Sequence, residues 1–380
     1  MVRFLHVSDT HIGSRQYMSD IREQDFYDAF TEVVDIAIRE KVDFIVHSGD
    51  LFDTWSPSNR ALVFFRDQAM RLRDAGIHTY MIMGDHDRPK RADYPAADIF
   101  DFLGITLLGA ENVEYSVFQS PDEEILIAGI SNMKGLRKDR LAEEYRKSDE
   151  KAKEYQSSIL ISHQGVKGFL HDDAIEVKKE DLPKNFSYLA FGHVHDSALQ
   201  LQRRPVFAYA GSTELKSDRE VNYYLKYGKA VNIVDLKAGQ VQVKRTVLTA
   251  TRPQLLLDTD YDHYLDDIRN GIEKYGQRFG TKEPYITLKV NGDGDRDEVR
   301  HRLKEIGSAI FRPPIFSQAS ASPEVKVGVN NATEFIQEYF REDPDLMNLT
   351  LSFFREYRDN PEEAIAFLKT KLENYKEGPT

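Results

Sequence analysis

Five short apolar runs that each end in a polar cluster constrain this sequence more than any other feature. Each run has the length and the β-branched or aromatic content of a strand, and a polar cluster rich in His, Asp, Ser or Gly follows it directly. Because the same design occurs five times, we predict that the runs are strands whose polar ends meet at one shared site. The runs cover residues 2–7, 44–46, 79–83, 159–161 and 188–191.

Two amphipathic helices are predicted between the first three runs. Apolar residues recur there at the spacing of a buried helix face, Ser58 is placed to cap the second helix, and Gly76 stands where a C-terminal cap would. The alternation of strands and helices predicts a parallel α/β sheet. Ligands of such sheets bind at the carboxyl edge, where the polar clusters fall. The periodic positions are Phe26, Phe30, Val33 and Ala37, then Leu62, Phe65, Ala69 and Leu72.

The pattern changes after residues 211–213, and we divide the chain into three parts. Residues 1–250 form the first domain, Arg252 and Pro253 mark the boundary, and residues 251–330 form a smaller α+β capping domain. We expect this capping domain to be a structural module without chemistry of its own. The predicted later elements are strands at 230–234, 241–247 and 285–290 and helices at 261–279 and 295–306.

The remaining residues, 331–380, are predicted to form a C-terminal helical segment. Pro361 is placed to open its last helix. A short segment with so many apolar side chains has to bury them, either against the capping domain or on another chain. The positions at helical spacing are Phe335, Ile336, Tyr339, Phe340, Leu349, Phe353, Phe354, Tyr357, Ile365, Leu368 and Leu372.

Composition excludes several kinds of site. The 380 residues include no Cys, which rules out disulfides, thiolate zinc sites, iron–sulfur clusters and thiol nucleophiles. The formal net charge of −12 means that a nucleic acid would have to bind at a local basic patch. No apolar run approaches the roughly 18 residues of a membrane helix, and no signal-peptide core follows Met1, so we expect a cytoplasmic protein.

The polar clusters contain the residue types that bind transition-metal ions. Carboxylate oxygens and imidazole nitrogens in this ratio suit Mn, Fe or Zn better than Ca. A carboxylate shared by two ions would hold them the ~3.5–4 Å apart that phosphoester hydrolysis uses. Any one of these motifs alone is more often a chance match or a hydrogen-bonded structural histidine, but their co-occurrence favours a metal site. The candidates are Asp9, His11, Asp50, Asp85, His86, His163, His193 and His195.

These motifs resemble the signature of the calcineurin-like metallophosphoesterases. The residues that carry the resemblance are Asp9-Thr10-His11, Gly49-Asp50, Gly84-Asp85-His86-Asp87, His163 and Gly192-His193-Val194-His195. Their flanks are similar to those of the SbcD-type DNA double-strand-break repair nucleases, and the similarity covers residues 1 to about 250. The flanking residues are Ser8 to Gly13, Gly49 to Phe52, His163 to Gly165, Gly192 to His195 and Gly211-Ser212.

The resemblance implies a fold and an activity. The fold would be a metallophosphoesterase β-sandwich flanked by helices. The activity would be that of a homodimeric, manganese-dependent nuclease with double-strand exonuclease and single-strand endonuclease activity, working with an SMC-like coiled-coil ATPase in double-strand-break repair. The alternative on the same fold is a phosphatase or phosphodiesterase for small or phosphoprotein substrates. A metal-free interaction module is a third class, against which the intact ligand set argues.

By resemblance, the motifs would hold two Mn²⁺ ions per chain. The first ion would take Asp9, His11, Asp50 and His195, and the second would take Asp50, Asp85, His163 and His193. Asp50 would bridge them. His86 would protonate the leaving oxygen or stabilise the charge on the phosphate, with the orientation of a ligand as its alternative role.

Two positions depart from the family pattern. The family usually has Asn where this chain has Asp85, and it usually has His where this chain has Asp53. The extra carboxylates make the site more negative, so we expect tighter metal binding and weaker activity than the family pattern suggests.

DNA and partner contacts are predicted from loops and from the C-terminal segment. Basic residues beside the motifs can neutralise phosphates and Tyr17 can stack on a base, although ordinary solvated loop charge is the alternative for each one. The capping domain would add DNA contacts, and the C-terminal helices would dock on the ATPase. The predicted DNA contacts are Arg15, Tyr17, Arg88, Lys90 and Arg91, and the predicted partner contacts are Phe340, Leu349, Phe353, Phe354, Ile365 and Leu368.

Overall fold

The computed structural model groups the chain into two compact units, Met1–Ser317 and Gln318–Thr380. The division into three domains at residues 250 and 330 stays a prediction. The structure describes residues 1–89, 94–169, 175–201, 204–275, 280–317 and 347–353.

A first six-stranded sheet carries three of the five predicted runs. Its strand order is β12-β11-β1-β2-β3-β4, with β1 to β4 parallel and with β11 antiparallel to both β1 and β12. The predicted strands and the parallel start of the fold are therefore confirmed. The strands are β1 (Val2–Val7), β2 (Phe44–His47), β3 (His78–Met81), β4 (Ile105–Leu107), β11 (Ala230–Lys237) and β12 (Gln240–Val247).

Two long helices cover the outer face of this sheet, as the periodicity predicts. They are α1 (Asp20–Glu40) and α2 (Asn59–Asp74), and their apolar stripes pack against Leu5, Ile45 and Met81 of the strands. The Ser58 side chain caps α2 by accepting a hydrogen bond from the Ala61 N–H at 3.2 Å.

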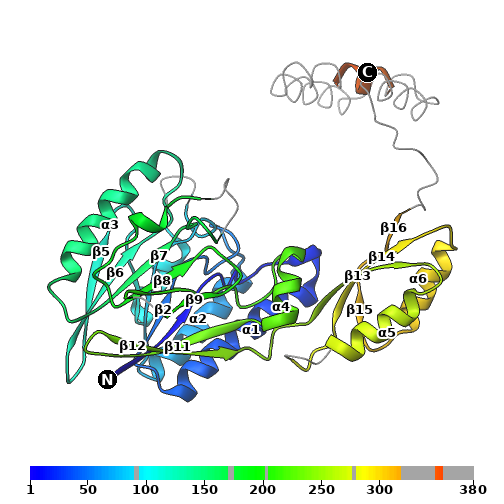
Figure 1. Ribbon diagram of the computed structural model, residues 1–380. Helices are drawn as coiled ribbons and strands as arrows, with labels where there is room; N and C mark the ends of the chain where they lie inside the picture. Colours follow the sequence, from blue (N-terminus) through cyan, green and yellow to red (C-terminus); the bar gives the residue numbers. More distant parts are fainter. Residues whose placement is uncertain (90–93, 170–174, 202–203, 276–279, 318–346, 354–380) are drawn as a thin grey trace. The chain divides into compact units, whose positions relative to one another are not determined.

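A second six-stranded sheet carries the other two runs, in the order β5-β6-β7-β8-β10-β9. Helix α3 (Lys138–Ala152) covers the outer face of this second sheet (Figure 1). The inner face of the second sheet packs against the first sheet, and the core between them includes Phe4, Val46, Ile127 and Ile161. The polar ends therefore belong to two stacked sheets, as in the β-sandwich that the resemblance implies, and not to the single sheet edge expected from the strand pattern alone. The strands are β5 (Glu114–Gln119), β6 (Glu124–Ile130), β7 (Ser157–His163), β8 (Tyr188–Gly192), β9 (Ala198–Gln200) and β10 (Val206–Tyr209).

The described part of the predicted capping domain, up to residue 317, is a four-stranded sheet with two helices around its own core. Strand β14 pairs in parallel with β13, β15 and β16, and Leu255, Ile268, Leu288 and Val299 lie in the core. Helix α5 begins three residues later than predicted. The elements are β13 (Gln254–Asp260), α5 (Tyr264–Tyr275), β14 (Tyr285–Asn291), α6 (Arg296–Glu305), β15 (Ile310–Phe311) and β16 (Ile315–Ser317).

A buried charge network joins the capping domain to helix α1. Asp25 accepts hydrogen bonds from Arg22 at 2.5 Å, from Arg252 at 2.7 Å and from Lys282 at 2.8 Å. Arg22 also donates to Glu214 at 2.9 Å, and the side chains of this pair are fully buried. We call these five residues the joint network.

Short helices complete the described structure. Residues 347–353 of the second unit are helical, and they include the predicted partner contacts Leu349 and Phe353. Phe340, Phe354, Ile365 and Leu368 lie outside the described residues. None of the described helices has both the length and the apolar character to cross a membrane. The other short helices are α4 (Val221–Tyr227) and the 3₁₀ turns η1 (Gln16–Met18), η2 (Ala96–Leu103), η3 (Gly135–Arg137), η5 (Lys179–Asp181) and η6 (Asp218–Glu220).

Candidate metal centre

The seven predicted metal ligands lie together at the carboxyl ends of strands from both sheets. The first sheet supplies the residues that follow β1, β2 and β3, and the second supplies the end of β7 and the loop after β8. The seven are Asp9, His11, Asp50, Asp85, His163, His193 and His195, and their nitrogen and oxygen atoms form three overlapping groups.

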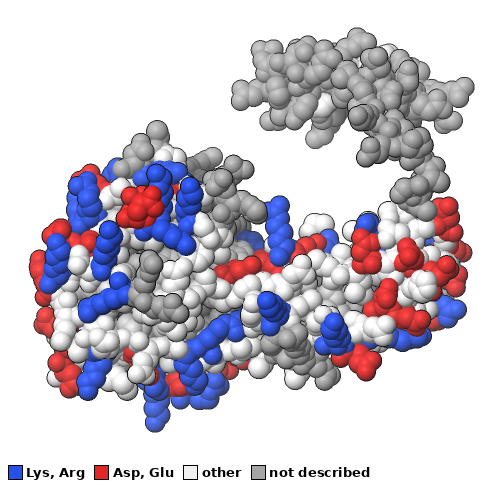
Figure 2. Space-filling model, viewed as in Figure 1, with Lys and Arg blue, Asp and Glu red and all other residues white. Residues whose placement is uncertain are grey.

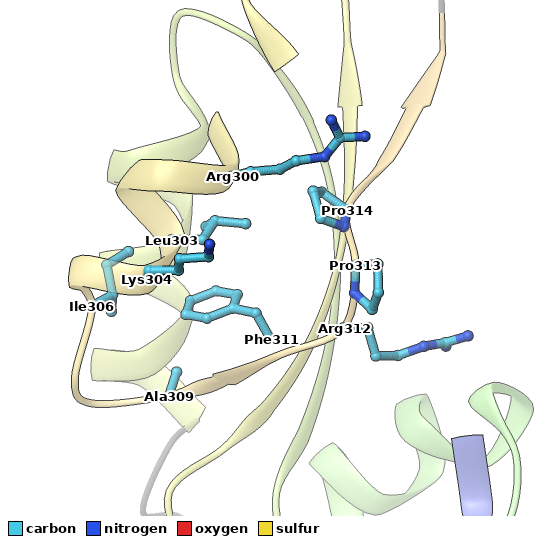
Figure 3. Close-up of a pocket in the computed structure, with 9 residues that line it drawn as sticks. All are labelled: Arg300, Leu303, Lys304, Ile306, Ala309, Phe311, Arg312, Pro313 and Pro314. Atoms are coloured by element: carbon cyan, nitrogen blue, oxygen red, sulfur yellow. The ribbon is translucent and has the colours of Figure 1, made fainter. Parts of the chain in front are cut away.

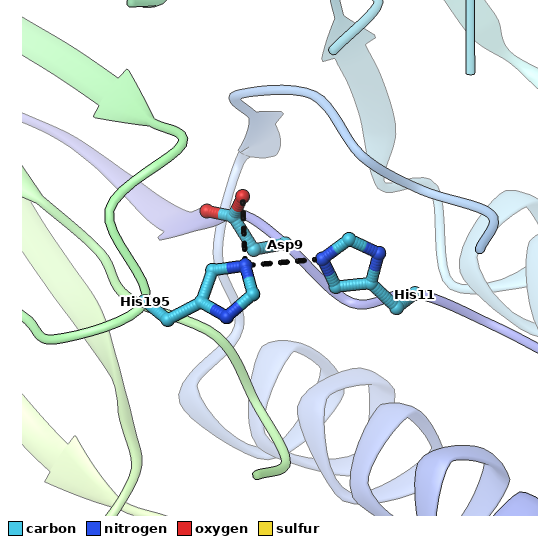
Figure 4. Close-up of side chains that lie close together, drawn as sticks. All are labelled: Asp9, His11 and His195. Atoms are coloured by element: carbon cyan, nitrogen blue, oxygen red, sulfur yellow. Dashed lines mark hydrogen bonds and ion pairs between the residues drawn. The ribbon is translucent and has the colours of Figure 1, made fainter. Parts of the chain in front are cut away.

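The first group consists of Asp9, His11 and His195 (Figure 4). The His195 Nε2 atom lies 3.2 Å from His11 Nε2 and 3.9 Å from Asp9 Oδ1. Ligand atoms around one transition-metal ion lie about 3 to 3.5 Å apart when each bond is about 2.1 Å long. The group is therefore close to the size that such an ion needs.

The second group consists of Asp85, His163 and His193. Asp85 Oδ1 lies 3.3 Å from His163 Nε2 and 3.1 Å from His193 Nδ1. Asp50 lies between the two groups, because its Oδ2 atom is 3.7 Å from His11 Nε2 and 3.6 Å from His163 Nε2. One carboxylate oxygen thus faces a histidine of each group, as a bridging ligand would.

The backbone that presents these side chains is unusual. Four of the seven residues have a positive φ: Asp9 at 50°, His11 at 41°, Asp50 at 55° and His193 at 89°. Such conformations cost free energy in non-glycine residues and persist where surrounding structure enforces them, often at functional sites. Close packing also requires Gly84, where an added Cβ would lie 1.9 Å from Asp50 Oδ1.

Neighbouring groups orient two of the imidazoles. His163 Nδ1 lies 2.7 Å from the Ser48 carbonyl oxygen, to which it donates, so Nε2 is the atom left to face the carboxylates. His195 Nδ1 lies 3.0 Å from Glu220 Oε1, and Lys229 donates to the other oxygen of Glu220 at 2.6 Å. Burial alone would raise the pKa of Glu220, but Lys229 and His195 lower it well below its usual range.

The cluster strongly attracts positive charge. Burial alone would lower the pKa of His163, but the carboxylates of Asp50 and Asp85 outweigh it and raise that pKa to about 10. Burial is also the main cause of the raised pKa of Asp50. Within the described residues, neither Asp9 nor Asp50 has a Lys or Arg partner. Buried carboxylates without such partners are a feature of sites that bind metal ions, and this donor set fits the ions expected from the sequence.

Two lysines, whose place at this site was not predicted from the sequence, neutralise the two unusual carboxylates. Lys134 Nζ lies 2.8 Å from Asp85 Oδ2, and Lys216 Nζ lies 2.7 Å from Asp53 Oδ1. The expected surplus of negative charge is therefore offset by a cation at each position. Sequence reasoning also missed Glu220, although Ser217 followed by Glu220 three residues later is the pattern of a capping box, which the structure contains.

His86 lies at the edge of the first group. Its Nδ1 atom is 2.7 Å from the Asp53 carbonyl oxygen, and its backbone N–H donates to Asp50 Oδ1 at 2.9 Å. Its ring meets the His11 ring edge to face, with 4.8 Å between the centroids. The contacts with Asp53 and Asp50 hold the ring beside the cluster.

The described residues expected to bind DNA are already engaged in protein contacts. The Tyr17 hydroxyl donates to Asp218, its ring stacks on Tyr285 at 5.7 Å between centroids, and the Arg312 guanidinium lies 3.7 Å from its centroid. In this arrangement Tyr17 is part of the contact with the capping domain, so stacking on a base would require these contacts to open.

The basic loop residues are similarly occupied. Arg88 donates to the carbonyl oxygens of Asn132 and Ala110, while the exposed Arg15 pairs with Asp20 at 2.6 Å. Lys90 and Arg91 lie outside the described residues. DNA contact by all of these residues stays a prediction.

The capping domain has a separate hollow of about 450 Å³. Three basic side chains and an apolar floor line it, without a carboxylate (Figure 3), so it is not a metal site. Elsewhere on the visible face of the capping domain, acidic side chains gather (Figure 2). The lining residues are Arg300, Leu303, Lys304, Ile306, Ala309, Phe311, Arg312, Pro313 and Pro314.

Comparisons with known proteins agree with this geometry. The calcineurin-like phosphoesterase family matches residues 2–197. A DNA double-strand break repair protein Mre11 of Thermoplasma acidophilum is 44% identical over 89% of this chain and 88% of its own length. Proteins with the same name are 35% identical in Sulfurisphaera tokodaii, over 80% of this chain and 78% of the relative, and 27% identical in Methanococcus maripaludis, over 97% and 98%.

Proposed function

Because the chain belongs to the Mre11 family of DNA double-strand break repair proteins, within the calcineurin-like phosphoesterases, we propose that it is a two-metal, manganese-dependent DNA nuclease. The single observation that carries this proposal is the pair of buried carboxylates, Asp9 and Asp50, that lie among four histidines without a Lys or Arg partner in the described structure. The activities proposed are exonuclease action on duplex ends and endonuclease action on single strands.

The proposed ligand sets follow the two groups of side chains. Asp9, His11, Asp50 and His195 would hold one ion, while Asp50, Asp85, His163 and His193 would hold the other. When bound, a pair of divalent ions supplies polarisation of the phosphoryl oxygens and a more acidic water. Asp50, whose Oδ2 atom faces a histidine of each set, is the proposed bridge.

The protein's own groups have three tasks in this proposal. The Ser48 carbonyl and the Glu220 carboxylate fix the tautomers of His163 and His195, so that each Nε2 presents its lone pair to the centre. Asp87 joins two ligand loops, because its carboxylate accepts from the Leu51 N–H at 2.9 Å and from the Phe52 N–H at 2.8 Å. His86 Nε2 is the proposed donor of a proton or hydrogen bond to the leaving oxygen.

A direct test measures metal content and cleavage on one purified sample of the full chain. We expect two manganese ions per chain and cleavage of a linear duplex in the presence of manganese. The competing function, hydrolysis of small or phosphoprotein substrates, predicts turnover of a chromogenic phosphodiester while the duplex stays intact. A protein that binds no divalent ion at micromolar concentrations would contradict both functions.

The proposal extends to a partner ATPase, a homodimer and a cytoplasmic location. The predicted helical pair over residues 332–376 would dock on the coiled-coil base of an SMC-like ATPase. Deletion of residues 331–380 should leave cleavage of simple substrates intact and abolish co-purification with the ATPase. A truncated protein that unfolds, or that still binds the ATPase at full strength, would show that the segment packs on its own chain.

A further inference from the structure

Lys216 places an ammonium group inside a further cluster of potential ligands. His11, Asp53 and His86 lie close enough together to hold a cation. Lys216 Nζ lies 2.7 Å from Asp53 Oδ1, 3.1 Å from His11 Nδ1 and 3.4 Å from both nitrogens of His86. A side-chain cation therefore takes the place that a third ion would need, directly beside the first metal group.

The backbone of Lys216 is held on both sides. The preceding residue, Leu215, accepts a hydrogen bond from the buried Arg22 guanidinium at 3.1 Å. The Lys216 N–H donates to Glu220 Oε1 at 3.2 Å, and the same oxygen accepts from His195 Nδ1. One carboxylate thus positions both a proposed metal ligand and the chain segment that carries the ammonium group.

The contacts of the Lys216 ammonium group within the described structure leave some of its N–H donors available. His11 needs its Nε2 lone pair to bind an ion, and its Nδ1 atom then carries the proton and cannot accept from Lys216. His86 Nδ1 donates to the Asp53 carbonyl oxygen, so that atom is no acceptor either, and His86 Nε2, 3.4 Å away, can accept at most one long hydrogen bond. The ion pair with Asp53, at 2.7 Å, is then the closest contact of the ammonium group. An ammonium group has three N–H donors, so donors remain for another acceptor.

The exposure of the pair indicates where that acceptor comes from. The side chains of Lys216 and Asp53 are 22% and 25% exposed, whereas that of His11 is fully buried. The pair is therefore partly open to solvent, directly beside the first metal group. A phosphate oxygen is the matching acceptor, because phosphate carries negative charge and accepts several short hydrogen bonds.

We propose that Lys216 is a catalytic residue: anchored by Asp53, its ammonium group binds a non-bridging oxygen of the scissile phosphodiester and stabilises the negative charge that grows there. This inference rests on the proposed nuclease function. Lys216 forms no bond to phosphorus and transfers no proton. Its contribution is electrostatic, and a positioned donor contributes most when it is aimed at charge that develops in the transition state.

The test compares Lys216→Met, which keeps the length without the charge, with Lys216→Arg, which keeps the charge. Lys244→Met is the matched control, because Lys244 pairs with Glu40 on an exposed surface. For Lys216→Met we expect two manganese ions as in the wild type and a loss of about 10²- to 10³-fold in single-turnover cleavage of a linear duplex. Lys216→Arg should recover cleavage to within about tenfold, and Lys244→Met should change neither quantity.

A second measurement does not depend on cleavage. With divalent ions chelated, duplex binding is followed by fluorescence anisotropy over a range of salt concentrations. Loss of one phosphate contact should make the slope of log K against log salt shallower by about 0.9 in Lys216→Met. If Lys216→Met does not fold, Asp53→Asn, which removes the anchor, should weaken single-turnover cleavage with the metal content kept.

The outcomes separate this inference from the proposed function. A wild-type protein without metal or nuclease activity would contradict the function, and the salt slope would still decide whether Lys216 contacts phosphate. Cleavage by Lys216→Met at the wild-type rate, or an unchanged slope, would overturn the role of Lys216 alone. Loss of metal from Lys216→Met would also overturn it, because Lys216 would then be a support of the metal site.

Discussion

Two buried clusters of charged side chains differ in whether the protein itself supplies the positive charge that their carboxylates need. In the joint network, the carboxylates of Asp25 and Glu214 are met by Arg22, Arg252 and Lys282 through hydrogen bonds of 2.5–2.9 Å. In the metal centre, two equally buried carboxylates face imidazoles and each other. The first cluster is complete within the protein, whereas the second lacks positive charge.

The difference identifies which cluster is structural and which is functional. A buried ion network with all partners present holds two parts of a protein in register. A buried cluster that lacks cations is costly in the folded protein unless protons or metal ions supply the missing charge. The raised pKa of His163, which the carboxylates of Asp50 and Asp85 cause against the effect of burial, is a sign of that deficit. A partner-complete network and a partner-deficient one should therefore respond differently to the loss of one residue.

The largest effect is expected at the deficient cluster. Asp50→Asn should lower duplex cleavage by at least about 10⁴-fold, because polarisation of the phosphate and activation of water both depend on the ion pair. Metal content should fall in the same sample, while the melting temperature without metal should hold or rise as repulsion among carboxylates is relieved. The surface variant Asp67→Asn is the control. A metal-replete Asp50→Asn protein would show that Asp50 is no bridge.

A variant of His86, at the edge of the metal centre, should separate metal binding from cleavage. His86→Ala is expected to retain two metal ions and DNA binding while cleavage falls by about 10²- to 10⁴-fold, the usual contribution of a proton-transfer group. Metal analysis and anisotropy on the same preparation provide the check. Loss of metal together with activity would place His86 inside the deficient cluster as a ligand or support.

A variant of the joint network should change the free energy of unfolding. Glu214→Ala leaves the Arg22 guanidinium buried with a lost partner, which should lower the free energy of unfolding by about 3–5 kcal/mol. Replacing both residues, as Arg22→Met with Glu214→Leu, should recover most of that loss because no unpaired charge remains. Urea unfolding of the two variants measures the difference. A single variant as stable as the wild type would show that the joint network is not a balanced unit.

The smallest effect is expected at Glu220, which contacts the proposed metal ligand His195 without being a proposed ligand itself. Glu220→Gln keeps the shape of the side chain but weakens the acceptor of His195 Nδ1, and loss of such an outer partner usually lowers metal affinity or activity about 10- to 100-fold. Competition with a chromogenic chelator measures the affinity. Equal affinity in wild type and variant would mean that His195 needs no orienting carboxylate.

Local patterns in the sequence predicted much of the fold and of the centre. Short apolar runs and period-3.6 repetition are properties of neighbouring residues, so the strands β1, β2, β3, β7 and β8 and the helices α1 and α2 could be placed from them. The strands β4, β5, β6, β9, β10, β13, β15 and β16 were missed. Residues 114–119 alternate only weakly, and β9 has three residues, which is too short for a pattern.

The ligand candidates were found because each follows directly after a strand, so a local signal marks it. The partners of those candidates carry no such signal. Lys216 meets His11 across 205 residues of sequence, and Arg252 meets Asp25 across 227. Only the folded chain brings these groups together, so their pairing could not be predicted from spacing.

The sequence by itself determined the kind of chemistry, since residue types at strand ends set which ions such a site can hold. The tertiary structure decided the rest: that two stacked sheets share the centre, that Tyr17 lies against the capping domain, and that a lysine stands beside the first metal group. The physical reason is the distance along the sequence over which each kind of interaction acts. Propensity and periodicity act between neighbours, whereas burial and charge pairing act between whichever groups the fold brings within a few ångströms.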